Sequence, residues 1–190
     1  MEKSKFQELM TKKSLAIVHF SHFAKMTHAV EFPCDLHHAI NSFQSEARSC
    51  CAIWPGHRMN LPDSVGVIFK PTFEQVCSVL QDDSGSSDYG GKELSGGVNP
   101  SEETILESLN VVDGRYNEWR VLGAKPIGIF VANTVDICVK KKVTLSCNGE
   151  AIEDFHCTSI TLEDLLDEFL GMGIFTMGSG GLCPVTANGV

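Results

Sequence analysis

The chain has 190 residues, of which 43% are hydrophobic and 21% are charged, and its formal net charge is −9. This length and composition are typical of one globular domain with a buried core. The acidic balance argues against a protein that binds nucleic acid or an anionic membrane surface through phosphate groups.

The first part of the sequence predicts two helices and four short strands. Apolar residues at helical spacing indicate helices over residues 3–12 and 33–43. Apolar runs rich in β-branched residues predict strands over residues 14–20, 50–54, 64–70 and 76–80. Residues 82–100 are then rich in Gly, Ser and Asp, which predicts a long loop inside the domain.

The second part of the sequence predicts two more helices, over residues 101–109 and 161–170. Between them we expect short strands over residues 116–122, 126–131, 135–139 and 143–147, the last ending in an Asn-Gly hairpin turn. Because strands and helices do not alternate regularly, the predicted fold is α+β with short, mostly antiparallel strands. We expect a single domain over residues 1–170 and a loosely packed, Gly-rich tail over residues 171–190.

Glu118 is the first candidate for a catalytic residue. It stands at the start of a predicted strand, and a carboxylate at the rim of a buried sheet can be held rigidly for chemistry. His19 and Ser21 stand at the end of the first predicted strand, and a Ser-rich segment, residues 83–87, lies in the long loop. We expect the fold to bring these three pieces together, with Glu118 on one wall of a cleft and His19 and Ser21 on the other.

The order of these pieces resembles that in mono-ADP-ribosyltransferases. Members of that family place an Arg or His on an early strand, Ser, Thr or Tyr residues on a middle element, and a Glu at the start of a late strand that leads through a Pro-containing turn into another strand. More narrowly, four phrases are similar to those of bacterial effectors that modify ubiquitin on a threonine: His-Phe-Ser-His at 19–22, Ser-Val-Gly-Val-Ile-Phe at 64–69, Asp-Ser-Gly-Ser at 83–86 and Tyr-Asn-Glu-Trp-Arg-Val at 116–121. The resemblance covers roughly residues 14–132.

The resemblance implies split, mostly antiparallel sheets around an NAD cleft, with a few flanking helices. Glu118 would stabilise the positive charge on the ribose when nicotinamide leaves, and His19 would be the second catalytic residue. The residues implied to bind NAD, as a co-substrate, are His19, Phe20, Ser21, Ser84, Ser86, Tyr116 and Asn117. Tyr116 stands where arginine-modifying members carry an acid or amide, which favours a hydroxyl acceptor.

The implied acceptor is a host protein, with a threonine of ubiquitin as the expected target. The sequence shows no secretory signal peptide and no apolar run long enough to span a bilayer. We therefore expect a bacterial effector that acts in the host cytosol, or otherwise a cytoplasmic protein. We expect a monomer, without nucleic-acid or membrane partners.

Other functions remain open on the residues alone. The eight Cys are irregularly spaced, which favours reduced thiols over a disulfide framework. Cys50 or Cys51 with His57 or His156 could supply the nucleophile and base of a cysteine hydrolase acting on a protein. A non-enzymatic interaction module is a further alternative. The ligand-rich segment 34–38 lacks a second ligand pair at a spacing typical of zinc sites, so we expect no metal.

Overall fold

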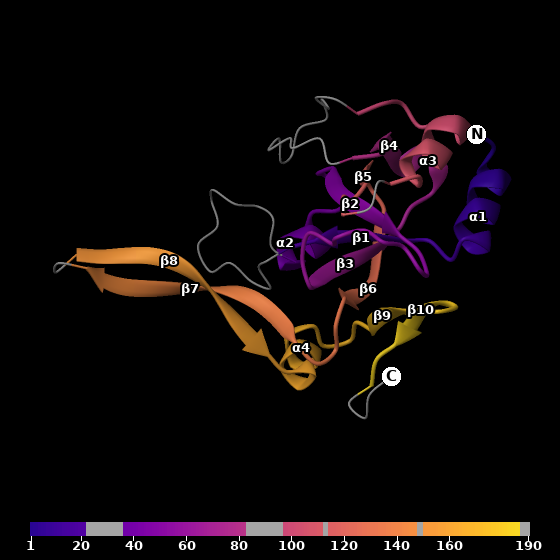
Figure 1. The fold of residues 1–190 in the computed structure, drawn as a ribbon. Coiled ribbons are helices and arrows are strands. Elements are labelled where there is room, and N and C mark those ends of the chain that lie inside the picture. Colours follow the sequence, from indigo (N-terminus) through magenta and orange to yellow (C-terminus); the bar gives the residue numbers. More distant parts are fainter. Residues whose placement is uncertain (22–35, 83–96, 112–113, 148–149, 187–190) are drawn as a thin grey trace.

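The computed structural model describes residues 1–21, 36–82, 97–111, 114–147 and 150–186, with the backbone alone for 140–147 and 150–156. In these ranges, short helices accompany a mostly antiparallel sheet (Figure 1). The helical elements are α1 (Lys3–Lys12), α2 (Leu36–Asn41), the 3-10 turn η1 (Phe73–Gln75), α3 (Glu102–Ser108) and α4 (Leu162–Glu168). The strands are β1 (Ala16–Phe20), β2 (Arg48–Ile53), β3 (Val65–Lys70), β4 (Val76–Leu80), β5 (Glu118–Val121), β6 (Lys125–Val131), β7 (Ile137–Cys147), β8 (Glu150–Ile160), β9 (Ile174–Gly178) and β10 (Gly181–Pro184).

Eight of these strands form one open sheet in the order β10-β9-β6-β3-β1-β2-β5-β4. All neighbouring pairs run antiparallel except β6 and β9, which run parallel. The α+β prediction with mostly antiparallel strands is thus confirmed. β1, β2 and β5 are adjacent in this order, although β5 lies far from the other two in the sequence.

β2 changes its partner halfway along its length. Its second half pairs with β1, up to Val18 opposite Cys51, whereas its first half pairs with β5, up to Cys50 opposite Trp119. β1 continues against β3 as far as Phe20. The end of β1 and the start of β2 therefore belong to different parts of the sheet.

The two faces of the sheet carry separate cores, because successive residues of a strand point to opposite faces. One core receives a side chain from every described helix: Phe6, Leu36, Ile105 and Leu165. We call the side of the sheet that carries it the helix face. The other core, on what we call the loop face, is built around Val18, Cys51, Ile68 and Phe130, and is covered by Met59 and Leu61 from the loop after β2 and by Met177 and Leu182 from β9 and β10.

β7 and β8 form a separate two-stranded ribbon whose far end projects away from the sheet (Figure 1). Its base is fixed by the buried side chains of Ile137 and Val139, and the Ser64 hydroxyl donates a hydrogen bond to the Cys138 carbonyl at 2.8 Å. The sequence predicts two strands here, over 135–139 and 143–147. One strand forms instead, because the intervening lysines include no residue that favours a turn. The expected hairpin is present, with its Asn-Gly turn outside the described residues.

The expected loose tail is wrong for residues 174–184, which extend the sheet as β9 and β10. Ile174 and Val185 are buried in the core of the helix face. The glycines of this segment serve the turn between the two strands, where Gly181 has a φ of +124° that other residues rarely adopt. The Ser14 hydroxyl ties this turn to the start of β1 by donating to the Gly180 carbonyl at 3.2 Å.

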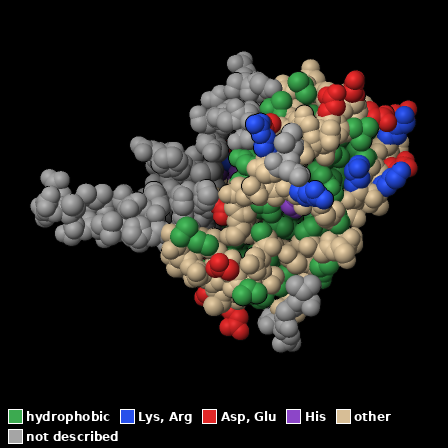
Figure 2. Space-filling model, viewed as in Figure 1, with side chains coloured by type: hydrophobic (Ala, Val, Ile, Leu, Met, Phe, Trp, Pro, Cys, Tyr) green, Lys and Arg blue, Asp and Glu red, His purple; other side chains and the backbone are tan. Residues whose placement is uncertain are grey.

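Residues 83–96, most of the predicted long loop, lie outside the described residues. Val98, just beyond them, returns to the sheet, and the Val79 N–H donates to its carbonyl at 3.1 Å. None of the helices in the described ranges is both long and apolar enough to cross a membrane. Figure 2 shows basic and acidic side chains interspersed around α1 and α3, where Lys5 and Glu102 approach to 3.8 Å.

Candidate active site

Glu118 opens β5 as predicted, and its side chain is buried, with 4% of its surface exposed. The Nε of Arg120, itself only 5% exposed, donates to Oε1 of Glu118 at 3.1 Å. Residues two apart on a strand share a face, so the strand itself aligns the two charges. A buried ion pair of this kind contributes little net stability, because desolvating both charges offsets their attraction. The hydrogen bond from Arg120 does, however, fix the direction of the Glu118 carboxylate inside the protein.

Trp119 determines which face of the sheet Glu118 occupies. The Trp119 side chain is fully buried on the helix face, where its ring lies 6.4 Å from that of Phe6 and its Nε1 donates to the Ser108 hydroxyl at 2.8 Å. Its neighbours Glu118 and Arg120 therefore point to the loop face.

Two serines from the neighbouring strands flank this ion pair. Ser49 of β2 and Ser78 of β4 both stand opposite Arg120 in the strand register. Residues directly opposite each other share a face, so both hydroxyls belong to the loop face. Arg120, Ser49 and Ser78 are absent from the residues predicted by sequence. The sequence held one signal that could have identified Arg120 as a site residue: it is a charged residue two positions after Glu118, within an otherwise apolar strand.

Asn117, predicted to bind NAD, is engaged with the backbone instead. Its Oδ1 accepts from the Ala52 N–H at 2.8 Å, and its Nδ2 donates to the carbonyls of Ala52 and Ser108, both at 3.1 Å. The amide thus holds the start of β5 against β2 and α3. Asn117 positions Glu118 rather than presenting its side chain to a ligand.

Two of the other predicted residues, Tyr116 and Phe20, lie near the loop face. Tyr116 and Phe20 are partly buried against the loop-face core, and the Phe20 ring meets that of Phe130 edge-on at 5.7 Å. Ser21 is buried just after β1, with its N–H donating to the Val65 carbonyl at 3.2 Å. Ser84 and Ser86 lie outside the described residues.

His19 lies on the face opposite to Glu118. Its neighbour in the strand, Val18, belongs to the loop-face core, so the His19 side chain points to the other face. Val67, which pairs with His19 across β1 and β3, belongs to the helix-face core. The ring is 4% exposed, and its Nδ1 lies 2.7 Å from the Ser49 carbonyl oxygen. Because a carbonyl only accepts, Nδ1 carries the proton and donates.

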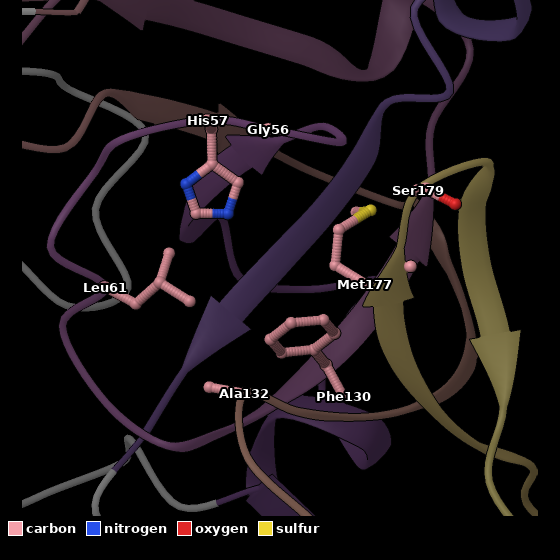
Figure 3. Close-up of a pocket in the computed structure, with 8 residues that line it drawn as sticks. Gly56, His57, Leu61, Phe130, Ala132, Met177 and Ser179 are labelled. Carbon is pink, nitrogen blue, oxygen red and sulfur yellow. The ribbon is translucent and has the colours of Figure 1, made fainter. Parts of the chain in front are cut away.

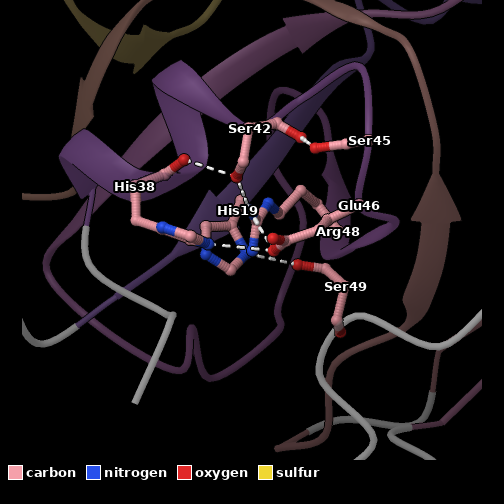
Figure 4. Close-up of polar contacts among 7 residues, drawn as sticks. All are labelled: His19, His38, Ser42, Ser45, Glu46, Arg48 and Ser49. Carbon is pink, nitrogen blue, oxygen red and sulfur yellow. Dashed lines mark hydrogen bonds and ion pairs between the residues drawn. The ribbon is translucent and has the colours of Figure 1, made fainter. Parts of the chain in front are cut away.

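The surroundings of His19 form a polar cluster between α2 and β2 (Figure 4). Nη2 of the buried Arg48 donates to Oε2 of Glu46 at 2.8 Å, and the same oxygen lies 2.9 Å from Nε2 of His38. Partial burial alone would raise the pKa of Glu46, but the hydrogen bond from His38 and the Arg48 charge outweigh it and hold that pKa below its ordinary value. The predicted cleft with Glu118 and His19 on facing walls is therefore not formed by these two side chains.

The two candidate cysteine nucleophiles also lie on opposite faces. Cys50 belongs to the helix-face core and Cys51 to the loop-face core, and both are buried. Burial, reinforced by the neighbouring Cys51, raises the pKa of the Cys50 thiol well above its ordinary value, so the thiolate that a hydrolase needs is disfavoured. The His156 side chain lies outside the described part. This geometry does not favour the hydrolase alternative for Cys50.

A labelling experiment tests this conclusion about the cysteines. Treatment of the folded protein with iodoacetamide at pH 8 is expected to modify Cys50 at least about tenfold more slowly than the exposed Cys157, because only the thiolate reacts. Peptide mass spectrometry after timed quenching gives the rates for each cysteine, and the urea-unfolded protein is the control in which the rates converge. Fast modification of Cys50 in the folded protein would contradict the assignment.

Comparison with protein-family models, with curated proteins and with solved structures finds no match to this chain. Within the described ranges, no group of three or more His, Cys, Asp or Glu side chains is arranged to hold a metal ion. The candidate active site therefore rests on the geometry around Glu118 and on the resemblance of the sequence motifs.

Proposed function

We propose that the chain is an NAD-dependent mono-ADP-ribosyltransferase that modifies a protein, with a threonine hydroxyl of ubiquitin as the acceptor. One observation carries this proposal: a buried, ion-paired carboxylate opens β5, which pairs with β2, and β2 in turn pairs with β1. The family that the sequence resembles uses an early strand, a middle element with hydroxyl side chains and a late strand headed by Glu. β1, β2 with Ser49, and β5 with Glu118 follow one another in the sheet, with Ser49 in place of the predicted residues 83–87, but His19 of β1 lies on the other face and takes no part.

In the proposed transfer of ADP-ribose, the protein has to position the reactants and to stabilise one charge. The bond between nicotinamide and ribose C1′ breaks, and its electron pair leaves with nicotinamide, which becomes neutral. The acceptor oxygen then bonds to C1′ and loses its proton to solvent. In the transition state the ribose carries positive charge, which a fixed carboxylate stabilises most strongly at that point. In this proposal Glu118 supplies the carboxylate, and Arg120 fixes its direction.

The residues on the loop face fit a bound dinucleotide in type. Phe20 and Tyr116 offer aromatic rings for a base, and Ser49 offers a hydroxyl for ribose or phosphate. The absence of a second acid at position 116 supports a hydroxyl acceptor over arginine. In line with the sequence motifs, we propose that the protein acts as a bacterial effector inside a host cell.

The test is transfer of label from NAD to protein. The purified chain is incubated with biotin-labelled NAD, first with a eukaryotic cell lysate and then with purified ubiquitin. We expect nicotinamide release and a labelled band, with the label on ubiquitin lost when its threonines are replaced by valine. NAD left intact in the presence of both lysate and ubiquitin would overturn the proposal, whereas label on another protein would correct the acceptor alone.

A His19→Ala variant tests the division between the two faces. Loss of the hydrogen bond to Ser49 and of buried ring volume is expected to reduce the free energy of unfolding by about 1–3 kcal/mol. NAD consumption per folded molecule should change less than about threefold. His19→Asn is the matched control, since its amide can still donate from nearly the same position. Loss of NAD consumption in His19→Ala at unchanged stability would mean that His19 does belong to the active site.

A further inference from the structure

A cavity of about 370 Å³ opens on the loop face, next to β6 and β9 (Figure 3). Its walls come from three elements: the loop after β2, the end of β6, and the turn between β9 and β10. The lining residues are Gly56, His57, Leu61, Phe130, Ala132, Met177, Gly178 and Ser179. The volume lies within the range of small-molecule sites, at about 300–1,000 Å³.

Four side chains converge on this cavity (Figure 3). The His57 ring enters from the loop, the Leu61 side chain from the same loop, the Phe130 ring from β6 and the Met177 thioether from β9. Phenyl rings and thioethers both make favourable contacts with aromatic rings. Among the described residues that line the cavity, none is Lys, Arg, Asp or Glu, so these walls favour an uncharged group.

His57 gives the cavity one directed hydrogen-bond donor. Burial lowers the pKa of His57 below its ordinary value, so the ring is neutral at pH 7.5. Its Nδ1 accepts from the Met59 N–H at 3.3 Å, which leaves the single ring proton on Nε2. That nitrogen is at the far edge of the ring, which points toward Phe130 and Met177 (Figure 3).

We propose that this cavity is a binding site for an uncharged heteroaromatic ring that accepts a hydrogen bond from Nε2 of His57. The aromatic and thioether walls favour a flat ring. The proton on Nε2 of His57 favours a ring that carries a hydrogen-bond acceptor at its edge, either a ring nitrogen or a carbonyl oxygen. β3, β1 and β2 separate β6 from β5 in the sheet. Phe130 also contacts Phe20, which the proposed function assigns to NAD, but the probes used below need no NAD, so binding here is measured apart from any chemistry at Glu118.

Isoquinoline and indole make a matched pair of probes, since both are uncharged two-ring molecules at pH 7.5 but only isoquinoline has a ring nitrogen that accepts. In ¹H–¹⁵N spectra we expect saturable shifts at the amides of Leu61, Phe130 and Met177, with isoquinoline binding about five- to tenfold more tightly than indole. The same titrations in a Glu118→Gln protein should give the same affinities.

Two variants test the assignment of the donor. In His57→Phe the ring remains but the proton is lost, so isoquinoline affinity should fall about five- to tenfold, to that of indole, while indole affinity is unchanged. Leu61→Trp should fill the cavity and abolish the shifts from both probes, with the melting temperature reporting that the fold is intact. Equal affinities for the two probes in the unaltered protein, or shifts that never saturate, would overturn the proposal.

Discussion

Replacing Glu118 with Gln is expected to lower the rate of NAD consumption by at least about a hundredfold, because removing one fixed stabilising group from a transition state typically costs a factor of 10² to 10³. Gln keeps the size of the side chain and removes its charge. In the proposed mechanism the interaction with ribose strengthens mainly in the transition state, so kcat should fall while the KM for NAD changes little. Nicotinamide release at several NAD concentrations separates the two constants.

A second variant separates lost chemistry from lost structure. Glu118→Gln leaves the buried Arg120 guanidinium facing a neutral amide, and disrupting one half of a buried pair can destabilise a protein by about 3–5 kcal/mol. In Glu118→Gln with Arg120→Gln, both charges are gone, so stability should recover toward that of the unaltered protein while the proposed NAD consumption stays low. Activity within a few-fold of normal in the single variant would contradict the role of Glu118. Recovered activity in the double variant would do the same.

Replacing Trp119 with Ala is expected to reduce the free energy of unfolding by about 3–5 kcal/mol, the usual cost of truncating a large buried aromatic side chain. Trp119 is fully buried, packs near Phe6 and donates to the Ser108 hydroxyl. It therefore joins β5 to both α1 and α3. Urea denaturation followed by far-UV circular dichroism measures the change.

Trp119→Phe is the matched control for this variant. It keeps one aromatic ring but removes the indole donor and part of the buried volume, so the expected loss is smaller, about 1–2 kcal/mol. A loss below about 1 kcal/mol in Trp119→Ala would mean that Trp119 does not fill the helix-face core. The side of the sheet assigned to Glu118 would then be wrong as well.

Local sequence patterns predicted most of the elements correctly. α1 shows the helical spacing of apolar residues, β3 is a β-branched run, and β5 lies within the predicted strand over 116–122, beginning at Glu118. The class of the fold followed from the irregular order of strands and helices. These features depend on neighbours in the sequence, where hydrophobic period and turn residues act directly.

The sequence could not predict which strands become neighbours. β5 and β6 follow each other in the chain, yet β2, β1 and β3 separate them in the sheet. The turn between them contains Gly123, whose φ is +73° and whose N–H donates to the Phe43 carbonyl, a residue 80 positions earlier. Such pairings depend on contacts between distant segments that no local period contains.

The sequence also could not predict on which face of the sheet the side chains of His19 and Glu118 lie. A shift of one residue moves a side chain to the other side of the sheet, so the order of His19 and Glu118 in the sequence carried no information about a shared cleft. The structure places the two on opposite faces. The tail was mispredicted for a related reason: its glycines build a tight turn in the sheet rather than marking a loose end.

Titration of the protein with NAD tests most directly whether the proposed NAD site exists and lies on the loop face beside Glu118. NMR spectra of the aromatic side chains report both faces, with Phe20 and Tyr116 on the loop face and the Trp119 indole N–H on the helix face. We expect saturable shifts of Phe20 and Tyr116 while the Trp119 signal stays nearly constant. Shifts that are largest at Trp119 and His19, or no shift at any of these residues, would contradict this account.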